Sequence, residues 1–359
     1  MQRCLDLAKN GLRAAMPNPS VGAVLVHEGR IIGEGFTSPY GGPHGEVNCI
    51  NSVAEDDKHL IPDSTLYVSL EPCSHYGKTP PCCDLIIHHK IKNIVVGTAD
   101  PHEKVAGNGI KRLREAGNTV LVGVLEEECR EMNRRFFTFH EKKRPYIILK
   151  WAESADGFIA PLRNPDASLR QAQGDLADKQ PVWITYPYAR QLVHKWRSEE
   201  MAILAGTQTV IDDNPSLDVR DWTGPNPVRV VFDRTGRISS DYTVKNSKIK
   251  TIVLTEQENC TNLENLIFEK AVFNAQLPQT AMEVLYRHNL LSVIIEGGRH
   301  TLQTFIDAGF WDEARVFKGL VTFKGGTAAP TLTGEVTKKK AIGQDELLIF
   351  RNHGQYNNI

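Results

Sequence analysis

Short apolar runs that alternate with helical segments of about ten residues constrain the fold of this chain most strongly. In the N-terminal part, residues 64–71, 93–98 and 119–123 are rich in β-branched and apolar side chains, and amphipathic segments separate them. Parallel strands need crossover connections of this length, and helices usually cover both faces of such a sheet. The pattern therefore predicts an α/β domain with a mostly parallel sheet, a hairpin at residues 20–37, and one closing helix over residues 126–142.

A charged segment divides the chain. Residues 141–145 (EKKRP) lack apolar side chains and end in proline, which is typical of a linker, so a domain boundary is predicted between residues 143 and 144. The second part repeats the α/β pattern, with strands predicted at 145–154, 201–206, 227–233, 251–255 and 290–296. Residues 314–323 and 345–351 are predicted as paired edge strands. The charge runs at 126–128 and 338–340 are predicted to be solvent-exposed.

Composition excludes several classes of protein. The sequence is 41% hydrophobic and 24% charged with a formal net charge of −1, so it can form two cores and has no basic excess for a nucleic-acid partner. Its seven cysteines are scattered and odd in number, which does not fit a secreted disulfide framework. The first residues lack the apolar core of a signal peptide, and no apolar run approaches about 18 residues. We therefore expect a cytoplasmic protein that does not span a membrane.

Three side chains of the types that zinc prefers stand at the starts of predicted helices. His44 follows a Gly/Pro-rich loop, Cys73 follows a proline at the end of a strand, and Cys82 follows a double proline. One imidazole and two thiolates leave a tetrahedral zinc with an open position, which is typical of a catalytic site. Glu46 could then take and deliver a proton, provided that an irregular first turn lets Glu46 and His44 face one pocket.

The motifs around these residues are similar to those of a known family. H-x-E followed by P-C-x-x-C is typical of zinc deaminases, but here Tyr76 stands where the second cysteine would be, and the next cysteine is Cys82. The segments PNPSVGAVLV, GEGFTSPYGGPHGE and EPCSHYGKTPPCCD resemble the deaminase domain of the bifunctional riboflavin-biosynthesis family. In that family a diaminohydroxyphosphoribosylaminopyrimidine deaminase is fused to a 5-amino-6-(5-phosphoribosylamino)uracil reductase.

The resemblance implies a fold and roles for the N-terminal residues. It implies a cytidine-deaminase-like, three-layer domain over residues 1–143, with one Zn²⁺ per domain. The zinc ligands would be His44, Cys73 and Cys82, and Glu46 would be the catalytic proton shuttle.

Other positions of this domain are expected to contact the substrate or depart from the family. Asn18, which could also be a plain turn residue, and Lys78 are the expected substrate contacts. Cys83 is expected to be a free structural thiol. Gly45 and Asn48 stand where the family usually has alanine and histidine.

A glycine pair after an apolar run indicates a second candidate site. Gly297-Gly298 follows residues 290–296 and precedes a helical segment, an arrangement that lets a phosphate approach the backbone. The segments ILKWAESADG, VWITYPYARQLVHKWRSE, ILAGTQTVIDDNPSLDVR and IIEGGRHTL resemble the reductase half of the same fusion, which is similar to dihydrofolate reductase. The resemblance implies a dihydrofolate-reductase-like α/β domain over residues 144–359 that uses NADPH.

The matched motifs imply two groups of contacts in this domain. The expected NADPH contacts are Ala152, Trp183, Thr209, Asp213, Gly298, Arg299, His300 and Thr301. The expected substrate contacts are Arg197, Leu217, Arg220 and Glu296, since two arginines suit a 5′-phosphate. Arg197 could instead cap a helix, and Asp213 could be a turn residue. The chain departs from the family in a longer loop at residues 161–181, in Pro181, and in Arg234, which would sit beside the cofactor.

These features predict an enzyme of riboflavin biosynthesis that acts on phosphorylated pyrimidines, first by zinc-dependent hydrolytic deamination and then by NADPH-dependent reduction. The resemblance also implies a homo-oligomer formed through the reductase domain. Two alternatives stay open. A base- or tRNA-editing deaminase with an RNA-binding C-terminal domain is opposed by the charge balance and by Tyr76. A structural zinc module would need a fourth ligand, from Cys83 or a nearby histidine.

Overall fold

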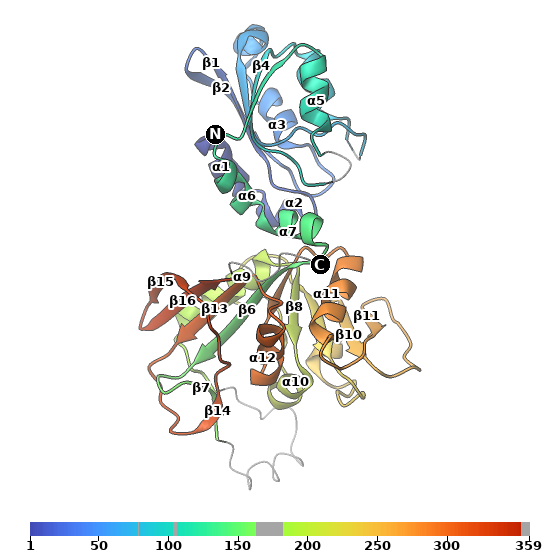
Figure 1. Ribbon diagram of the computed structural model, residues 1–359, viewed down its shortest axis with the longest axis vertical. Coiled ribbons are helices and arrows are strands. Elements are labelled where there is room, and N and C mark those ends of the chain that lie inside the picture. Colours follow the sequence, from blue (N-terminus) through green and yellow to red (C-terminus); the bar gives the residue numbers. More distant parts are fainter. Residues whose placement is uncertain (78, 103–105, 163–181, 353–359) are drawn as a thin grey trace. The chain divides into compact units, whose positions relative to one another are not determined.

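The computed structural model describes the chain except for residues 78, 103–105, 163–181 and 353–359 (Figure 1). Lys78, Pro181 and most of the loop at 161–181 therefore lie outside the described residues. The chain divides into two compact units, Met1–Arg144 and Pro145–Ile359. The division falls one residue after the position expected from the charged segment, because Pro145 directly precedes the first strand of the second unit.

The N-terminal unit contains a five-stranded mixed sheet. Its strands are β1 (Gly22–His27), β2 (Arg30–Phe36), β3 (Thr65–Leu70), β4 (Asn93–Thr98) and β5 (Thr119–Val122), in the order β2-β1-β3-β4-β5. Strands β3, β4 and β5 are parallel, and β1 is antiparallel to both β2 and β3. Glu28 and Gly29 join β1 to β2 with positive φ angles of 46° and 78°, as a tight hairpin turn requires.

Helices cover both faces of this sheet. They are α1 (Gln2–Ala8), α2 (Leu12–Ala15), α3 (Gly45–Asn51), the 3₁₀ helix η1 (Glu55–Asp63), α4 (Cys82–His88), α5 (Asn108–Glu115), α6 (Glu126–Met132) and α7 (Arg134–Lys142). Helix α1 contacts α6, while α4 contacts both α3 and α5. Val24 packs on the α1 side with Cys4, and its strand neighbours Ala23 and Leu25 are also buried, so β1 is covered on both faces. The expected three-layer α/β domain is confirmed.

Asn133 interrupts the helix that the sequence predicts over residues 126–142. The chain forms two helices, α6 and α7, and Asn133 between them has φ −106° and ψ 25°. Its buried side chain accepts a hydrogen bond from Ser20 N (2.9 Å) and donates one to Ser20 O (2.9 Å). The amide side chain thus pairs with the backbone as another strand would, and the prediction of one helix was wrong.

The C-terminal unit contains a nine-stranded sheet. The strands, in their order across the sheet, are β11 (Leu266–Lys270), β10 (Thr251–Thr255), β9 (Val228–Phe232), β8 (Ala202–Ala205), β12 (Ser292–Ile295), β6 (Tyr146–Glu153), β13 (Glu313–Lys318), β16 (Asp345–Arg351) and β15 (Val336–Ile342). Neighbours are parallel from β11 to β13, and β13-β16-β15 are antiparallel. Strands β7 (Phe158–Pro161) and β14 (Gly326–Ala328) form a separate pair.

The predicted pairing of the last strands is correct, but their place in the sheet differs. β13 pairs with β16 as expected, yet β13 lies inside the sheet because it also pairs with β6. The edge strand is β15, which contains the exposed run Lys338–Lys340. Lysines on an edge strand keep other chains from pairing with it, so a charge run that is solvent-exposed can still be a strand.

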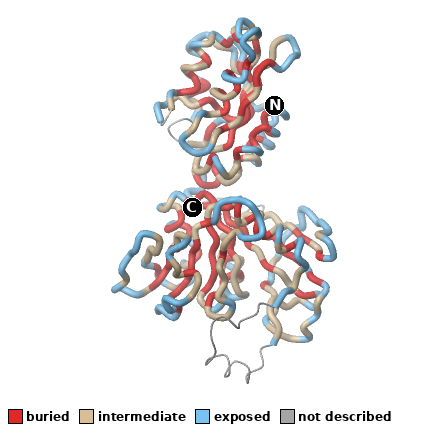
Figure 2. The backbone as a smooth tube through the Cα atoms, turned by 180° about the vertical axis from the view of Figure 1, so that it is seen from behind, coloured by how far each residue is buried: buried red, intermediate tan, exposed pale blue. Residues whose placement is uncertain are grey.

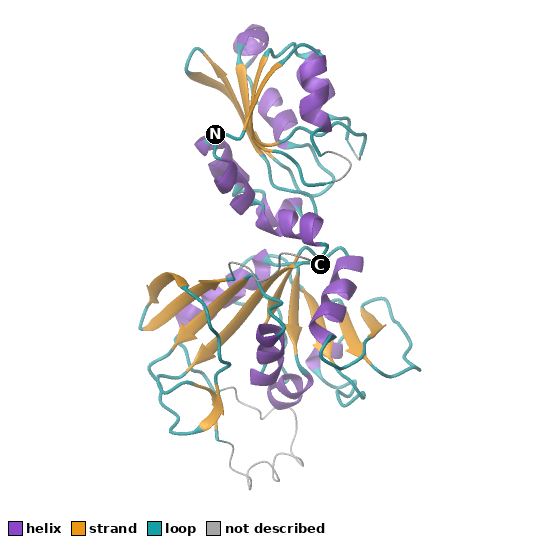
Figure 3. Cartoon of the chain, in the orientation of Figure 1, coloured by secondary structure: helices purple, strands orange, loops and turns teal. Residues whose placement is uncertain are grey.

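Helices cover both faces of the second sheet as well (Figure 3). They are α9 (Pro187–Glu199), α10 (Thr207–Asp213), the 3₁₀ helix η3 (Thr243–Lys245), α11 (Leu277–Arg287) and α12 (Arg299–Asp307). Along β6, Ile147 and Leu149 pack in the core with residues of α11 and α12, whereas Ile148 packs with residues of α9. The buried strands in Figure 2 follow from this alternation. Within the described ranges, no helix has the length and apolar character needed to cross a membrane.

Replacing Asn133 with alanine should destabilise the N-terminal unit. The variant leaves the buried N–H and C=O of Ser20 without partners, and an unsatisfied buried polar group costs about 1–3 kcal/mol. We expect the free energy of unfolding in urea to fall by roughly 2 kcal/mol or more. Asn93→Ala, at an exposed position in β4, is the control and should change it by less than about 0.5 kcal/mol. Equal losses in both variants would contradict this account.

Candidate active sites

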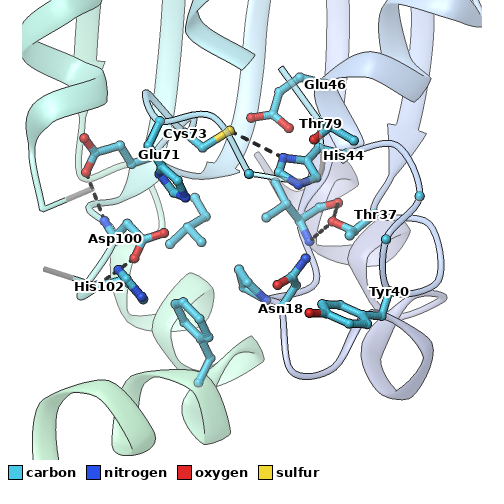
Figure 4. A pocket seen from close by; sticks show the side chains of 18 residues that line it. Asn18, Thr37, Tyr40, His44, Glu46, Glu71, Cys73, Thr79, Asp100 and His102 are labelled. Atoms are coloured by element: carbon cyan, nitrogen blue, oxygen red, sulfur yellow. Dashed lines mark hydrogen bonds between the residues drawn. The ribbon is translucent and has the colours of Figure 1, made fainter. Parts of the chain in front are cut away.

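His44 and Glu46 face the same cavity because His44 lies outside the helix. His44 is the N-cap of α3 with extended backbone angles (φ −75°, ψ 167°), and Glu46 is in the first helical turn. Both side chains line a cavity of about 410 Å³, and Figure 4 shows them beside Cys73. The irregular helix start that the sequence required is therefore present.

One imidazole nitrogen and two sulfurs lie together, and His44 and Cys73 line the cavity. The prediction that each of the three residues stands at the start of a helix was wrong for Cys73, which lies in the loop after β3, whereas His44 and Cys82 stand at the starts of α3 and α4. His44 Nδ1 is 3.5 Å from Cys73 Sγ and 3.4 Å from Cys82 Sγ. The three potential ligand atoms lie within 4.8 Å of one another, and no other histidine, cysteine or carboxylate of the described residues joins the group. Three nitrogen and sulfur donors at such distances fit one Zn²⁺ with an open position.

The surroundings favour deprotonation of one of the two thiols. Hydrogen bonds from the Cys82 side chain, from His44 and from the Cys82 backbone N–H (3.3 Å) lower the pKa of Cys73 to about 4 against the cost of burial. The hydrogen bond of the Cys82 thiol with Cys73, followed by burial, in turn raises the pKa of Cys82. Burial, followed by the charge of Cys73, raises the pKa of Glu46 to about 7. A cation in the group would stabilise the thiolates that repel each other without it.

Cys83 is a structural thiol, in agreement with the expectation. Its Sγ donates to Pro72 O (3.3 Å), and its backbone N–H donates to Cys73 O (3.1 Å). Burial raises the pKa of Cys83 to about 12, so this thiol stays protonated and can donate. The two adjacent cysteines therefore have different tasks: Cys82 joins the His/Cys cluster, and Cys83 ties the first turn of α4 to the backbone before Cys73.

The two departures near His44 have structural explanations. Asn48 donates to Phe36 O (2.7 Å) and Ser38 Oγ (2.9 Å), so it ties α3 to the end of β2. A Cβ at Gly45 would lie 2.6 Å from Val21 O, and a glycine is required for this approach of α3 to the backbone. This contact lies between segments that are distant in the sequence, so the sequence did not reveal it.

The cavity is lined by residues from several loops. Asn18, an expected substrate contact, lines it, and so do His75 and Thr79 from the loop after Cys73. Sequence reasoning missed Tyr40, Glu71, Asp100, His102 and Phe136, which also line it. Glu71 and Asp100 could have been found from the strand pattern. Glu71 directly follows β3, Asp100 comes two residues after β4, and the carboxyl ends of these adjacent parallel strands meet at one edge of the sheet. Burial raises the pKa of Asp100 to about 7.

The second candidate site lies at the carboxyl end of β12. Glu296 follows this strand and receives two hydrogen bonds from Arg197 of α9: Nε to Oε1 (3.0 Å) and Nη2 to Oε2 (2.9 Å). Lys150 Nζ of β6 is 3.5 Å from the same carboxylate. Burial alone would raise the pKa of Glu296, but the charges of Arg197 and Lys150 hold it at about 2.

The loop after α10 joins this ion cluster. Arg197 Nη1 donates to Asp218 O (3.1 Å), and Arg220 Nη1 pairs with Asp218 Oδ1 (2.9 Å). Leu217 has a positive φ of 50°, and its side chain is buried in the core, so a ligand contact there would come from its backbone. The Nδ1 atom of buried His194 accepts a hydrogen bond from the backbone N–H of Arg220 (3.4 Å). The structure thus brings Arg197, Glu296 and Arg220 together.

The expected cofactor residues fall into a connected group and several separate positions. Gly298 N donates to Thr209 Oγ1 (2.8 Å), and Thr301 lies against Gly206, where a Cβ would be 2.3 Å from its Oγ1. The starts of α10 and α12 are therefore adjacent, with Arg299 and His300 exposed on α12.

The remaining expected cofactor residues lie on other elements. Ala152 is in β6, and Asp213 is exposed at the end of α10. The Arg190 guanidinium lies 4.1 Å from the centre of the Trp183 ring. Arg234 pairs with Glu256 (Nε to Oε2, 2.8 Å), so it would have to leave this partner to reach a cofactor.

Comparisons with known proteins match both units. Residues 1–98 match the cytidine and deoxycytidylate deaminase zinc-binding region, and residues 145–354 match the RibD C-terminal domain. A riboflavin biosynthesis protein RibD of Aquifex aeolicus is 37% identical over 98% of this chain and 98% of its own length. One of Synechocystis is 38% identical over 94% of this chain and 87% of its own.

Solved structures give the same result. A diaminohydroxyphosphoribosylaminopyrimidine deaminase/5-amino-6-(5-phosphoribosylamino)uracil reductase from Thermotoga maritima superposes with a TM-score of 0.84, with 37% identity and coverage of 98% and 97% of the two chains. Acinetobacter baumannii RibD superposes with a TM-score of 0.83 and 29% identity, with the same coverage. The fold and the sites define a two-domain protein with a zinc-binding deaminase domain and a reductase domain. The chain belongs to the RibD family of riboflavin biosynthesis proteins.

Replacing Gly45 with alanine, the residue usual in the family, should destabilise this chain. Helix propensity alone would stabilise the variant by about 1 kcal/mol. The contact with Val21 O outweighs this gain, so we expect a loss of roughly 1–3 kcal/mol in the free energy of unfolding. Gly334→Ala is the control, since its nearest neighbour would lie 3.7 Å away. A more stable Gly45→Ala variant would show that the close approach is absent.

The Glu296 carboxylate should stabilise the C-terminal unit in a pH-dependent way. Its pKa is depressed from 4.5 to about 2, so the stabilisation is complete above about pH 4.5 and is lost as the pH falls towards 2. Glu296→Gln should lower the free energy of unfolding at pH 7 by an amount on the order of 3 kcal/mol, and the difference from wild type should shrink at pH 3. Denaturant titrations at pH 7 and pH 3 measure the difference in the free energy of unfolding between variant and wild type. Glu264→Gln, at an exposed position, is the control and should show little difference at either pH. A difference that is independent of pH would contradict the ion pair.

Proposed function

We propose that the N-terminal unit hydrolytically deaminates 2,5-diamino-6-ribosylamino-4(3H)-pyrimidinone 5′-phosphate and that the C-terminal unit reduces 5-amino-6-(5-phosphoribosylamino)uracil with NADPH. One observation carries the first half: three potential zinc ligands stand beside a buried carboxylate in a cavity of about 410 Å³. Membership of the RibD family and the printed activities of the Thermotoga maritima relative support both halves.

His44, Cys73 and Cys82 would hold the zinc ion. The donor set fits, because two sulfurs and one imidazole nitrogen are soft or borderline ligands and two thiolates balance the charge of Zn²⁺. When bound, the ion would lower the pKa of water towards neutrality and so supply a nucleophile for an aromatic carbon. Everything else in the deamination must come from the residues of the chain.

Glu46 would move the protons of the deamination. Its carboxyl group is buried next to the Cys73 and Cys82 sulfurs, and a pKa near 7 lets it accept a proton and release it again at neutral pH. It would take one proton from the attacking water and pass it to a ring nitrogen, and would then carry the proton of the new hydroxyl group to the exocyclic amine. The C–N bond then breaks, ammonia leaves, and the ring carbon keeps the oxygen as a carbonyl. One residue can serve both transfers because both occur on the same side of the ring.

The alternative functions find less support. A structural zinc module needs a fourth protein ligand, but Cys83 bonds to Pro72 O, and the described residues offer no fourth member of the cluster. An RNA-editing deaminase needs a basic surface, and the net charge is −1. The substrate would instead be a small phosphorylated pyrimidine. Asn18 and Asp100 would contact its ring and sugar, and Lys78 would bind its phosphate.

In the C-terminal unit, the ion cluster would hold the second substrate. The fork of Arg197 is occupied by Glu296, so we propose that Arg197 acts through this carboxylate, which accepts hydrogen bonds from the substrate. Arg220 is exposed and pairs only through its Nη1 with Asp218 and Ser216, so it is the better placed arginine for a 5′-phosphate.

NADPH would lie at the starts of α10 and α12. Gly206, Gly297 and Gly298 let these two helix starts pack closely through Thr209 and Thr301, and helix starts favour phosphates. Arg299 and His300 are exposed beside them. When bound, the nicotinamide supplies a hydride, which would be delivered to C1′ of the sugar. Ala152, Trp183, Asp213 and the Leu217 backbone remain proposed contacts. We also propose that chains associate through the reductase domain, which sedimentation of the full chain would test.

Two single substitutions should separate the two activities. Glu46→Gln should keep one zinc per chain and lower ammonia release from the diaminopyrimidine phosphate by about 10²–10⁴-fold, because the proton carrier is lost. It should leave NADPH oxidation with the deaminated intermediate unchanged. Arg197→Lys should do the reverse, because an ammonium cannot form the two-pronged contact with Glu296.

Ammonia release, NADPH oxidation and zinc content are measured on the same preparations. Loss of both activities in either variant would contradict two independent sites. Faster turnover with NADH than with NADPH would contradict the proposed cofactor.

A further inference from the structure

Glu71 occupies a special position between the sheet and the zinc ligands. It directly follows β3, its backbone N–H donates to Thr98 O of β4 (3.0 Å), and Cys73 comes two residues later. Its side chain is buried, with 3% of the residue exposed. A buried carboxylate needs partners, and among the described residues those of Glu71 are backbone amides.

In the part of the chain that the structure describes, four backbone N–H groups donate to this one carboxylate. Oε1 accepts from Gly109 (2.8 Å) and Ile110 (3.1 Å) in the first turn of α5, and Oε2 accepts from Asp100 (3.1 Å) and Gly107 (3.0 Å) before it. The carboxylate thus caps the amino terminus of α5, where negative charge is favourable. Figure 4 shows Glu71 beside Asp100, with the bond to the Asp100 backbone.

Helix α5 in turn holds the backbone on both sides of Cys73. At Gly109 a Cβ would lie 2.0 Å from Pro72 O, so the helix touches the residue before Cys73. Arg112 Nη1 donates to Ser74 O (3.2 Å), the residue after Cys73, and its guanidinium also pairs with Asp84 of α4. The position of Cys73 therefore depends on α5, and that of α5 on Glu71.

We propose that Glu71 is a positioning residue of the deaminase site: its four backbone hydrogen bonds fix α5 against residues 72–74, and so place Cys73 for the metal and Asp100 for the substrate. The proposal rests on the proposed deaminase function and deepens it. It also accounts for the order Glu-Pro-Cys in the sequence. The Glu71 carboxylate bonds to the start of α5, in the crossover between β4 and β5. Pro72 ends the strand, and Cys73 follows at a position that both neighbours hold in place.

The test compares wild type with Glu71→Gln. A glutamine side chain offers one acceptor oxygen and turns an NH₂ group towards N–H donors, so about half of the contacts become repulsive. We expect zinc binding to weaken by about 10–100-fold in competition with a chelator, as for other losses behind a metal ligand. We also expect the cysteine-to-metal absorption of the Co²⁺-loaded protein to change, and the kcat of ammonia release to fall. NADPH oxidation should stay unchanged.

Ser64→Ala is the matched control for plain loss of stability. Ser64 is buried at the other end of β3 and donates to Leu60 O (2.8 Å), away from the cavity. The variant should keep the wild-type zinc affinity and Co²⁺ spectrum. If Glu71→Gln does not fold, Arg112→Gln replaces it, because the Arg112 side chain is 43% exposed and its loss should weaken zinc binding in the same direction, by less.

Unchanged zinc affinity and an unchanged Co²⁺ spectrum in Glu71→Gln, or in Arg112→Gln where that variant is used, would overturn the proposal. Equal losses in Ser64→Ala would overturn it too, since they would show an unspecific effect of stability. If the wild-type chain binds zinc but releases no ammonia, the proposed function fails, while the metal affinity and the spectrum still decide the role of Glu71. If the wild type binds no zinc, both proposals fall.

Discussion

The contact of two cysteine sulfurs with one imidazole nitrogen is the constraint on which the N-terminal unit depends. The three residues come from the N-cap of α3, the loop after β3 and the first turn of α4, so three chain reversals must meet within a few ångströms. Hydrogen bonds hold them: Cys82 N–H to Cys73 Sγ, Cys83 N–H to Cys73 O, and the Cys83 thiol to Pro72 O. The two N–H groups are ones that a helix start leaves unpaired, so the site uses donors that would otherwise have to bond to water.

The second unit solves a different problem, the burial of charge. Glu296, Arg197 and Lys150 are all largely buried, and their mutual contacts offset a desolvation cost that each would bear alone. Burial lowers the pKa of the Lys150 ammonium, whereas the two cations hold the Glu296 pKa near 2. The cluster therefore keeps a carboxylate charged at the carboxyl end of a central parallel strand, where open α/β sheets bind their ligands. Both units thus place their reactive groups at strand ends.

Much of the fold and part of the sites could be predicted from the sequence. The alternation of strands and helices, the hairpin with Glu28 and Gly29, and the candidate metal ligands follow from local patterns. Local patterns did not reveal that Asn133 breaks a helix, because its partner is Ser20, more than a hundred residues away. They did not reveal β15 either, since a lysine-rich edge strand has no apolar face to detect. They did not reveal the role of Glu71, since its partners lie in the next crossover.

The sequence by itself determined the chemistry that the chain carries: which residue types could bind zinc, that these residues follow proline-containing breaks in the chain, and that glycines precede α12. These features depend on neighbours in the chain, through proline stops, helix starts and alternating apolar side chains. Only the tertiary structure decided which residues share a site. Asp100 reaches the cavity of His44 because β4 runs parallel to β3. Arg197 meets Glu296 because α9 packs on the face of the sheet to which β12 contributes Ile294. Such meetings arise from packing between segments far apart in sequence, which no local pattern records.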